Sequence, residues 1–468
     1  MGFDTTFHTS GAGLVDKEKM KFKFDQYNYN SLSQSAEAAK HSKTDGFETE
    51  PTTRLESLPQ FSRVVPFLYH LLDYEMYFGI WLRNFPFCIL NFNSRDHLLP
   101  STNGFAGEKK RQCRKCRYFK ICSGFPRGYF GKYGEKELRP VLDLPHEVMV
   151  EVEPKCNFNC QFCFNKLTFA KKGRNIKGLS TTFVKRIIKN ISQSEIKIVR
   201  FTGGEPLLRK DIFELIKYAK AKHLEVRLNT NGSLITPRTA KKLKGRVDNV
   251  LIPIESHNDK EESKIAGYPQ ALKSKIKAIK LLKKEKIPIV RVGTVASEKN
   301  ILNFNKMAKL ILALPINEWE WYRPISDKRS TEGINHQDVE NLVNKIIAIK
   351  KRTKVVISIA NALPFCAIDD LNKINSISSG ALFDDGHNRL VVDPRGFVKP
   401  HYFLDKNIGH PLDILGAWNH PFMKKMRNLK FVPPKCKKCS FIEKCRGGSR
   451  FLAKLYHGRW DAKDPLMP

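Results

Sequence analysis

No stretch of about 18 residues in this 468-residue chain is both apolar and free of charged side chains. The most apolar segment, residues 64–92, is interrupted by Asp73, Glu75 and Arg83, so we expect buried helix and strand there rather than a membrane span. A secretory hydrophobic segment is also missing near the N-terminus. These absences make the cytoplasm the expected compartment.

Acidic residues are scarce, because 47 Asp and Glu stand against 82 Lys and Arg and leave a formal net charge of +35. A positive field of this size attracts polyanions such as nucleic acid, an anionic membrane face or an acidic peptide segment. The basic residues are spread along the chain rather than gathered in one run. Nucleic acid is therefore one candidate partner, and a lysine-rich surface without a polyanionic ligand is the other interpretation.

Cysteine is plentiful and grouped, since nine of the 11 cysteines fall into three triads. The triads are Cys113, Cys116 and Cys122; Cys156, Cys160 and Cys163; and Cys436, Cys439 and Cys445. Without a secretory segment a disulfide framework is improbable, whereas closely spaced reduced thiols suit metal. We therefore expect the triads to bind metal, and we interpret Cys88 as a small buried side chain.

The chain divides into five segments by its pattern. Residues 1–60 are polar and are expected to form a mobile leader, and residues 61–142 a small accessory unit with the first triad. In residues 143–326 six β-branched runs alternate with helical patterns, which predicts parallel strands joined by right-handed crossovers. Residues 327–379 are expected to add a connecting helix and strand, and residues 380–468 a C-terminal extension.

The economical fold for this alternation is an α/β partial (β/α)6 barrel of the TIM type. In such barrels the reactive groups stand on loops beyond the C-terminal ends of the strands. The sequence KCNFNCQFC, residues 155–163, directly follows the first predicted strand. The second triad is therefore expected on the reactive face.

The second triad offers three thiolates from one loop, whereas a [4Fe–4S] cube has four corners. Its pattern C-x3-C-x-Φ-C, with Phe162 as the aromatic Φ, resembles the signature of the radical S-adenosylmethionine (radical SAM) superfamily. The resemblance implies a [4Fe–4S] cluster on Cys156, Cys160 and Cys163 whose open iron binds S-adenosylmethionine. It also implies reductive cleavage of that cofactor to a 5′-deoxyadenosyl radical, which abstracts hydrogen from a substrate.

Further motifs follow in the order that this family has them. Gly203-Gly204-Glu205-Pro206 matches the GGEP motif, which receives the methionine ammonium, and Asn231 lies in a TNG turn. The sequence around the fourth strand end departs from the family pattern. The resemblance, which covers about residues 145–326, implies these cofactor-binding positions: Phe162, Gly203, Gly204, Glu205, Asn231, Glu255, Val295 and Arg323.

The first and third triads share the spacing C-x2-C-x5-C, with a Gly and an Arg at matching offsets. The third, after a predicted hairpin that turns at residues 393–396, resembles the SPASM or twitch-like extension that carries auxiliary [4Fe–4S] clusters. His401, Ser449 and Met467 stand where that family has cysteines. One auxiliary cluster on Cys436, Cys439 and Cys445 is expected, and its remaining ligand is Cys366, a substrate atom or a residue of the first triad. The first triad itself is expected to bind either an iron–sulfur cluster or zinc.

The resemblance makes a peptide- or protein-modifying radical SAM enzyme the leading interpretation, with ferredoxin or flavodoxin as a low-potential electron donor. A porphyrin, another small metabolite or RNA is the alternative substrate. An interpretation from a different class is a nucleic-acid-binding protein whose triads bind structural zinc, which would also explain the basic residues around the cysteines. A brown, oxygen-sensitive protein supports the enzyme, and one zinc per triad supports the binding protein.

Overall fold

The computed structural model describes residues 5–8, 60–72, 79–82, 85–90, 98, 107–163, 176–325, 333–382 and 386–468. The predicted leader lies outside these ranges, apart from residues 5–8 and 60. The chain forms two compact units, residues 1–143 and residues 144–468. No helix within the described ranges is long and apolar enough to cross a membrane.

The first unit has a small aromatic core. Its elements are the antiparallel strands β1 (Thr5–His8) and β2 (Gly79–Leu82), the helices α3 (Phe61–Leu72) and α4 (Tyr129–Tyr133), and the short 3₁₀ helix η3 (Arg111–Lys115). The rings of Phe61 and Tyr129 lie 4.9 Å apart in this core. Cys88, Cys113 and Cys122 pack against the same apolar cluster, so two cysteines of the first triad border the core of this unit.

The second unit is built on one nine-stranded sheet in the order β11-β10-β3-β4-β5-β6-β7-β8-β9. Its strands are β3 (Glu147–Glu153), β4 (Ile198–Gly203), β5 (Glu225–Asn229), β6 (Asn249–Pro253), β7 (Ile289–Val295), β8 (Glu318–Tyr322), β9 (Val356–Ile359), β10 (Arg389–Val392) and β11 (Val398–Lys399). Neighbours from β10 to β9 pair in parallel, and β11 pairs antiparallel with β10. Within the described part of the chain β9 and β11 do not pair, so the barrel is open.

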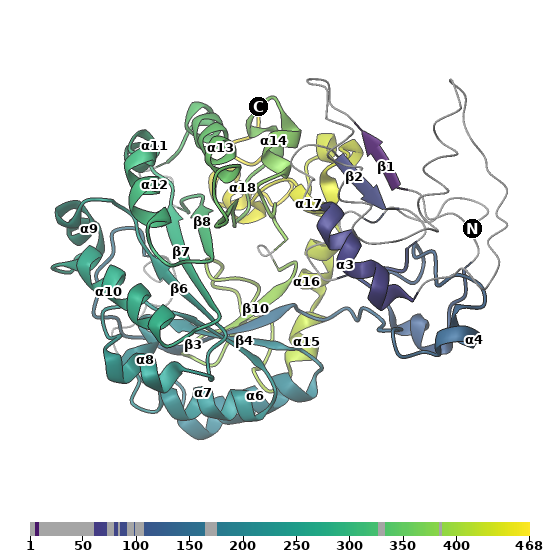
Figure 1. Cartoon of the computed structure of the whole chain (residues 1–468), viewed down its shortest axis with the longest axis horizontal. Helices are drawn as coiled ribbons and strands as arrows, with labels where there is room; N and C mark the ends of the chain where they lie inside the picture. Colours follow the sequence, from purple (N-terminus) through teal and green to yellow (C-terminus); the bar gives the residue numbers. More distant parts are fainter. Residues whose placement is uncertain are drawn as a thin grey trace. The chain divides into compact units, whose positions relative to one another are not determined.

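Helices between the strands cover the outside of this curved sheet (Figure 1). They are α6 (Thr181–Gln193), α7 (Ile212–Ala221), α8 (Pro237–Leu243), α9 (Asp259–Ala266), α10 (Ala271–Lys284), α11 (Glu298–Leu302), α12 (Phe304–Leu312) and α13 (His336–Lys350), with the 3₁₀ turn η5 (Pro206–Leu208) after β4. Ser180, Thr236 and Asn335 begin α6, α8 and α13 by accepting a hydrogen bond from the amide three residues further on. Each cap satisfies an N–H that has no partner within the helix.

Shorter helices follow toward the C-terminus. They are η6 (Phe365–Ala367), α14 (Leu371–Asn375), α15 (Ile414–Trp418), α16 (Pro421–Arg427), η7 (Pro434–Lys438), α17 (Ile442–Cys445) and α18 (Arg450–His457). Apolar side chains of both the barrel and these helices belong to one core cluster, which includes Val150 of β3 and Trp418 of α15. The C-terminal extension therefore shares its core with the barrel.

The predicted parallel α/β barrel is confirmed, and the sheet extends beyond the six strands that the sequence predicts. Strand β9 comes from residues 327–379 and β10 from residues 380–468, and both join the sheet of residues 143–326. The hairpin β10–β11 turns through Gly396, whose φ is 85°. Because β10 pairs with β3, more than 200 residues earlier, the local pattern could not reveal this contact.

Candidate active site

The loop after β3 carries the second cysteine triad. Asn159 N donates to Ala266 O at 2.9 Å, which ties the loop to the end of α9. Phe158 is buried, and its ring centroid lies 4.3 Å from that of Tyr268. The half-buried Phe162 is near the end of the described loop. The chain's own contacts therefore hold the start of this loop in place.

Two thiols of this loop, Cys156 and Cys160, lie in surroundings that oppose the thiolate form. Cys156 Sγ accepts hydrogen bonds from Phe158 N at 3.3 Å and Asn231 Nδ2 at 3.8 Å. Burial raises the pKa of Cys160 to about 12, although the Lys275 ammonium lowers it, and burial also raises the pKa of Cys156. Bound iron supplies the positive charge that turns such thiols into thiolates. Three thiols on one loop thus fit three corners of one cluster.

The GGEP motif after β4 packs directly on this loop. Gly204 N donates to Glu153 O at 2.7 Å, and Gly203 has a φ of 132°. A Cβ on Gly203 would lie 2.5 Å from Glu153 O, and one on Gly204 would lie 3.0 Å from the amide nitrogen of Cys156. Because only glycine allows this approach, the motif sets the position of the first cysteine.

Glu205 fixes the neighbouring turn after β5. It is fully buried, and its carboxylate accepts from Thr230 Oγ1 at 2.8 Å, Asn231 N at 2.7 Å and Leu207 N at 3.0 Å. Burial raises the pKa of Glu205 to about 7, while these hydrogen bonds lower it. Asn231 in turn donates to Asn157 Oδ1 in the cysteine loop at 2.9 Å. The contact of Glu205 with the methionine ammonium stays a prediction.

Two predicted cofactor-binding positions meet at the ends of β6 and β7, because Glu255 Oε2 accepts from Val295 N at 2.7 Å. Burial raises the pKa of Glu255 to about 8, with a further increase from Glu262 and a decrease from Lys275. Glu262 accepts from Glu255 N at 2.7 Å and pairs with Lys275, and both are buried. Sequence reasoning missed Glu262 and Lys275 because neither lies in a motif and only the fold brings α9 and α10 here.

Arg323, after β8, makes a contact that the resemblance does not imply. Its Nη1 donates to Asp464 Oδ2 at 2.7 Å, and Asn361 Nδ2 donates to Arg323 O at 2.8 Å. Asp464 also accepts from Ser449 N at 2.7 Å. The ion pair therefore ties the barrel to the C-terminal extension, and a contact of Arg323 with the cofactor carboxylate stays a prediction.

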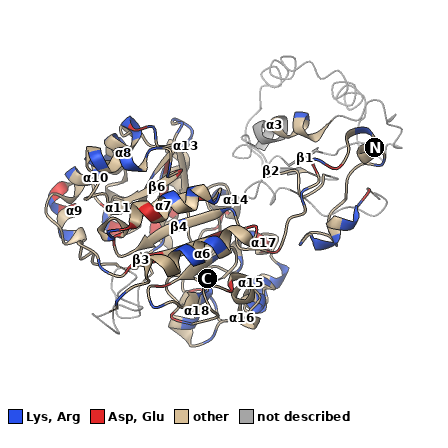
Figure 2. Ribbon diagram, turned by 90° about the horizontal axis from the view of Figure 1, so that it is seen from below, with Lys and Arg blue, Asp and Glu red and all other residues tan. Residues whose placement is uncertain are grey.

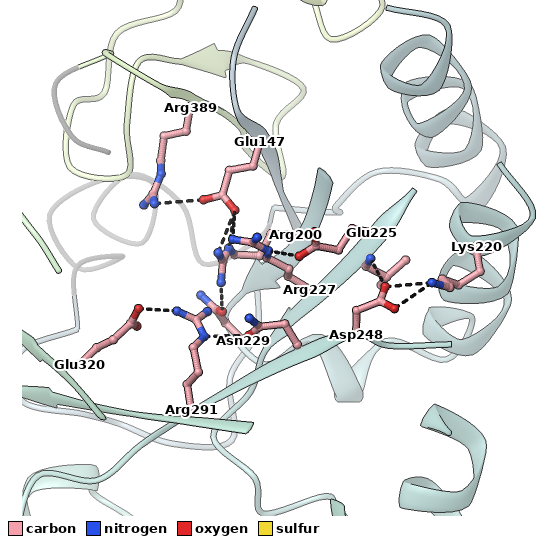
Figure 3. A network of polar contacts seen from close by, with 12 residues as sticks. Glu147, Arg200, Lys220, Glu225, Arg227, Asn229, Asp248, Arg291, Glu320 and Arg389 are labelled. Atoms are coloured by element: carbon pink, nitrogen blue, oxygen red, sulfur yellow. Dashed lines mark hydrogen bonds and ion pairs between the residues drawn. The ribbon is translucent and has the colours of Figure 1, made fainter. Parts of the chain in front are cut away.

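Charged side chains fill the inside of the barrel near the N-terminal ends of the strands (Figure 3). Three guanidinium groups surround the buried Glu147 at 2.8, 3.0 and 3.5 Å, those of Arg200, Arg389 and Arg227. Burial alone would raise the pKa of Glu147, but these cations bring it well below the usual range. Arg291 of β7 pairs with Glu320 of β8 at 2.6 Å. The network links the strands on which the reactive loops stand.

The outer triads lie in different units, the first in residues 1–143 and the third in residues 144–468. Ser449, which replaces a family cysteine, accepts from Leu452 N at 3.2 Å and begins α18, so its hydroxyl serves as a helix cap. Met467, at another such position, packs against Cys436. Within the described ranges no three His, Cys, Asp or Glu side chains converge closely enough to hold a single metal ion.

Comparison with known proteins gives a family for the barrel. The model of the Radical SAM superfamily matches residues 150–311. The AdoMet-dependent heme synthase of Methanosarcina barkeri is 26% identical over 218 residues, which are 46% of this chain and 61% of the relative, so this chain spans less than two thirds of that protein. The PqqA peptide cyclase of Granulibacter bethesdensis is 23% identical over 337 residues, 69% of this chain and 87% of the relative.

Solved structures of Streptococcus suis SuiB share the fold. SuiB bound to S-adenosylmethionine and SuiB bound to the precursor peptide SuiA superpose with TM-scores of 0.56 and 0.57 at 16% and 15% identity. Each match covers 69% of this chain, and the two cover 77% and 76% of SuiB. The match over residues 150–311, with the cysteine loop and the glycine motif packed on it, identifies the barrel as a radical SAM domain.

Proposed function

We propose that the chain modifies a side chain of a peptide or protein by radical SAM chemistry. Cys156, Cys160 and Cys163 would hold the [4Fe–4S] cluster. With S-adenosylmethionine this cluster supplies, when bound, a 5′-deoxyadenosyl radical that takes hydrogen from the substrate. The peptide substrate class is supported by two similar proteins, the PqqA peptide cyclase at 23% identity and the structural neighbour SuiB, whose structure holds a precursor peptide.

The observation that carries the radical SAM assignment is the packing of the glycine motif on the cysteine loop. Gly203 and Gly204 let the end of β4 approach the backbone of Cys156. Asn231 bonds to both Cys156 Sγ and the side chain of Asn157, so the turn after β5 orients the same loop. Three strand ends thus hold one thiol-bearing loop, which is the preorganisation that a cluster with one open corner needs.

The predicted cofactor positions enter the proposal from two sides of this loop. Gly203, Gly204, Glu205 and Asn231 would receive the amino-acid end of S-adenosylmethionine, and Glu255 with Val295 would contact its nucleoside. The hydrogen bond from Val295 N to Glu255 Oε2, at 2.7 Å, already brings Glu255 and Val295 together. Phe162 and Arg323 complete the proposed set.

The third triad would hold an auxiliary [4Fe–4S] cluster, and a ferredoxin or flavodoxin would supply electrons. Lys and Arg residues recur along the outer helices α6, α8 and α10 (Figure 2), and the whole chain carries a net charge of +35. Such a surface favours an acidic peptide segment or an acidic electron donor. RNA is a further candidate ligand of the same surface.

A second candidate substrate is a porphyrin or another small molecule, because one relative is an AdoMet-dependent heme synthase at 26% identity. The two classes are separable by anaerobic turnover with precursor peptides and with porphyrins, each followed by mass spectrometry. A mass change in a peptide supports the proposal, and a change in a porphyrin alone would replace it.

The radical chemistry itself is tested with the full chain after anaerobic loading with iron and sulfide. Given S-adenosylmethionine and dithionite, the protein should form 5′-deoxyadenosine, measured by liquid chromatography and mass spectrometry. Cys160→Ala should abolish this product, because it removes one of three ligands. Cys439→Ala should still form 5′-deoxyadenosine while losing conversion of the substrate. A fully loaded protein that forms no 5′-deoxyadenosine would disprove the assignment.

A further inference from the structure

Each outer triad is preceded by the same short sequence. Pro86-Phe87-Cys88 precedes the first triad, and Pro364-Phe365-Cys366 precedes the third. The two isolated cysteines of the chain therefore occur in identical tripeptides, one ahead of each C-x2-C-x5-C segment. This repeat indicates that the chain contains two copies of one module, which consists of a Pro-Phe-Cys tripeptide and a later C-x2-C-x5-C triad.

The triads themselves have the same backbone conformation. The first cysteine of each lies in a short 3₁₀ helix, η3 or η7, and the second cysteine ends that helix with φ −77° and ψ 131° for Cys116 and φ −77° and ψ 130° for Cys439. The amide of the third cysteine donates to the residue four before it at 2.8 Å in both, from Cys122 to Tyr118 and from Cys445 to Phe441. The first and third triads are thus equivalent in backbone geometry as well as in cysteine spacing.

The tripeptides also have matching conformations and contacts. The amide after the cysteine donates back to the proline carbonyl in both, from Ile89 to Pro86 at 3.3 Å and from Ala367 to Pro364 at 3.0 Å. The phenylalanine of each tripeptide packs on the aromatic residue two positions after the second cysteine of its triad. The ring centroids of Phe87 and Tyr118 lie 4.4 Å apart, and those of Phe365 and Phe441 lie 5.8 Å apart.

This packing brings a fourth thiol to each triad. In the first unit Cys88 lines one small pocket together with Cys113, Cys116 and Cys122. A solitary core cysteine has no need of such neighbours, so the interpretation of Cys88 as simple packing leaves this arrangement unexplained.

At the third triad Cys366 packs against the small cluster of Val432, Cys436 and Met467, and Phe365 N donates to Cys445 Sγ at 3.4 Å. The nearby Ser449 hydroxyl is used as a helix cap, and the Met467 thioether is a weaker ligand for iron than a thiolate. Cys366 is therefore a better donor than either of these two side chains.

We propose that Cys88 and Cys366 are the fourth ligands of two matched four-cysteine sites, each of which binds one [4Fe–4S] cluster. The choice of cluster rests on the proposed function, whereas the ligand sets rest on the repeated module. A cube with one thiolate at each corner spreads its sulfurs further than a single ion does, which agrees with the absence of a single-ion site among the described residues. Both outer clusters are then fully ligated by the chain, and neither offers an open iron to the substrate.

The test uses the full chain with Cys156, Cys160 and Cys163 all changed to Ala, so that only the outer sites bind iron. After anaerobic loading this background should contain about eight irons and eight sulfides per chain, four of each for each cluster. Adding Cys88→Ala or Cys366→Ala should remove about four of each, or leave iron whose electron paramagnetic resonance spectrum after reduction is changed. Adding both should affect both clusters.

Ile89→Ala is the matched control, because it removes a half-buried apolar side chain next to Cys88 without removing a thiol. It should keep the iron content and the spectrum of the background. The proposal is overturned if either cysteine variant keeps both the iron and the spectrum unchanged, if Ile89→Ala acts like Cys88→Ala, or if metal analysis finds zinc in place of iron. None of these measurements depends on 5′-deoxyadenosine, so failure of the proposed catalytic function is detected separately.

Discussion

Two glycines determine where the reactive loop lies. Gly203 and Gly204 have no Cβ, and the backbone of the cysteine loop occupies the space that a Cβ would need. A methyl group at either position must displace backbone atoms rather than the end of a flexible side chain. The effect of such a change should therefore appear first in the cluster and not in the rest of the fold.

Gly204→Ala should lower the iron content of the loaded protein and reduce 5′-deoxyadenosine formation by about tenfold or more, because a displacement near 1 Å is costly at a reacting centre. Iron analysis and product assay measure the two effects. Gly131→Ala is the control, since a Cβ built there meets nothing within 4 Å beyond its chain neighbours and the backbone of its own helix. Equal behaviour of the two variants would show that the close approach is unimportant.

Glu255 should make stability depend on pH. Its pKa is raised from 4.5 to about 8, so the native protein keeps this proton to a higher pH than the unfolded chain does. The contribution of this protonation to the free energy of unfolding is fully present below about pH 4.5. It is lost as the pH rises toward about 8, by an amount on the order of a few kcal/mol.

Glu255→Gln should therefore make the free energy of unfolding less dependent on pH between about pH 5.5 and 8.5, as measured by urea unfolding of the cluster-free protein. The exposed Glu340→Gln should leave the dependence of the original chain unchanged. A Glu255→Gln protein that loses as much stability as the original chain over this range would contradict the assignment.

Among the elements, the strands β3, β4, β5 and β10 are joined by charge as well as by backbone hydrogen bonds. Glu147 is the common partner of one arginine from each of the other three strands. The outward faces of these strands supply the apolar core, so the inward faces are free to carry polar groups. Removing the central carboxylate would leave several buried guanidinium groups without their counter-charge.

Glu147→Gln should lower the free energy of unfolding by about 3 kcal/mol, because breaking a buried ion pair leaves uncompensated charge. Glu225→Gln is the matched control, since Glu225 pairs with Arg227 at 2.6 Å but its side chain is 37% exposed. That change should cost less than about 1 kcal/mol. Urea unfolding measures both, and equal losses would argue against the central role of Glu147.

The charge of the whole molecule concerns its partners more than its fold. A formal charge of +35 over 468 residues produces a field that salt weakens. If the surface serves to hold an acidic peptide segment, an Asp- and Glu-rich peptide should bind about tenfold more weakly when salt rises from about 50 to about 300 mM. Fluorescence anisotropy measures this, with an Asn and Gln version of the peptide as control. Equal salt dependence of the two peptides would exclude this use of the charge.

The sequence alone predicts the parallel barrel, the order of its strands β3 to β8 and the cysteine loop on its reactive face. These features depend on local signals, namely alternating β-branched and helical patterns and closely spaced motifs such as GGEP. The hairpin turn at residues 393–396 was predictable for the same reason, because Pro394 and Gly396 are residues that favour turns.

Tertiary structure decided what depends on contacts between distant residues. The pairing of β10 with β3, the ion pair of Arg323 with Asp464 and the approach of Glu262 and Lys275 to Glu255 join segments whose local sequence carries no sign of the partner. The same holds for Cys88, a solitary cysteine by spacing that the fold places beside a triad. A pattern along the chain reports local conformation, whereas burial and charge pairing are set only when the chain closes on itself.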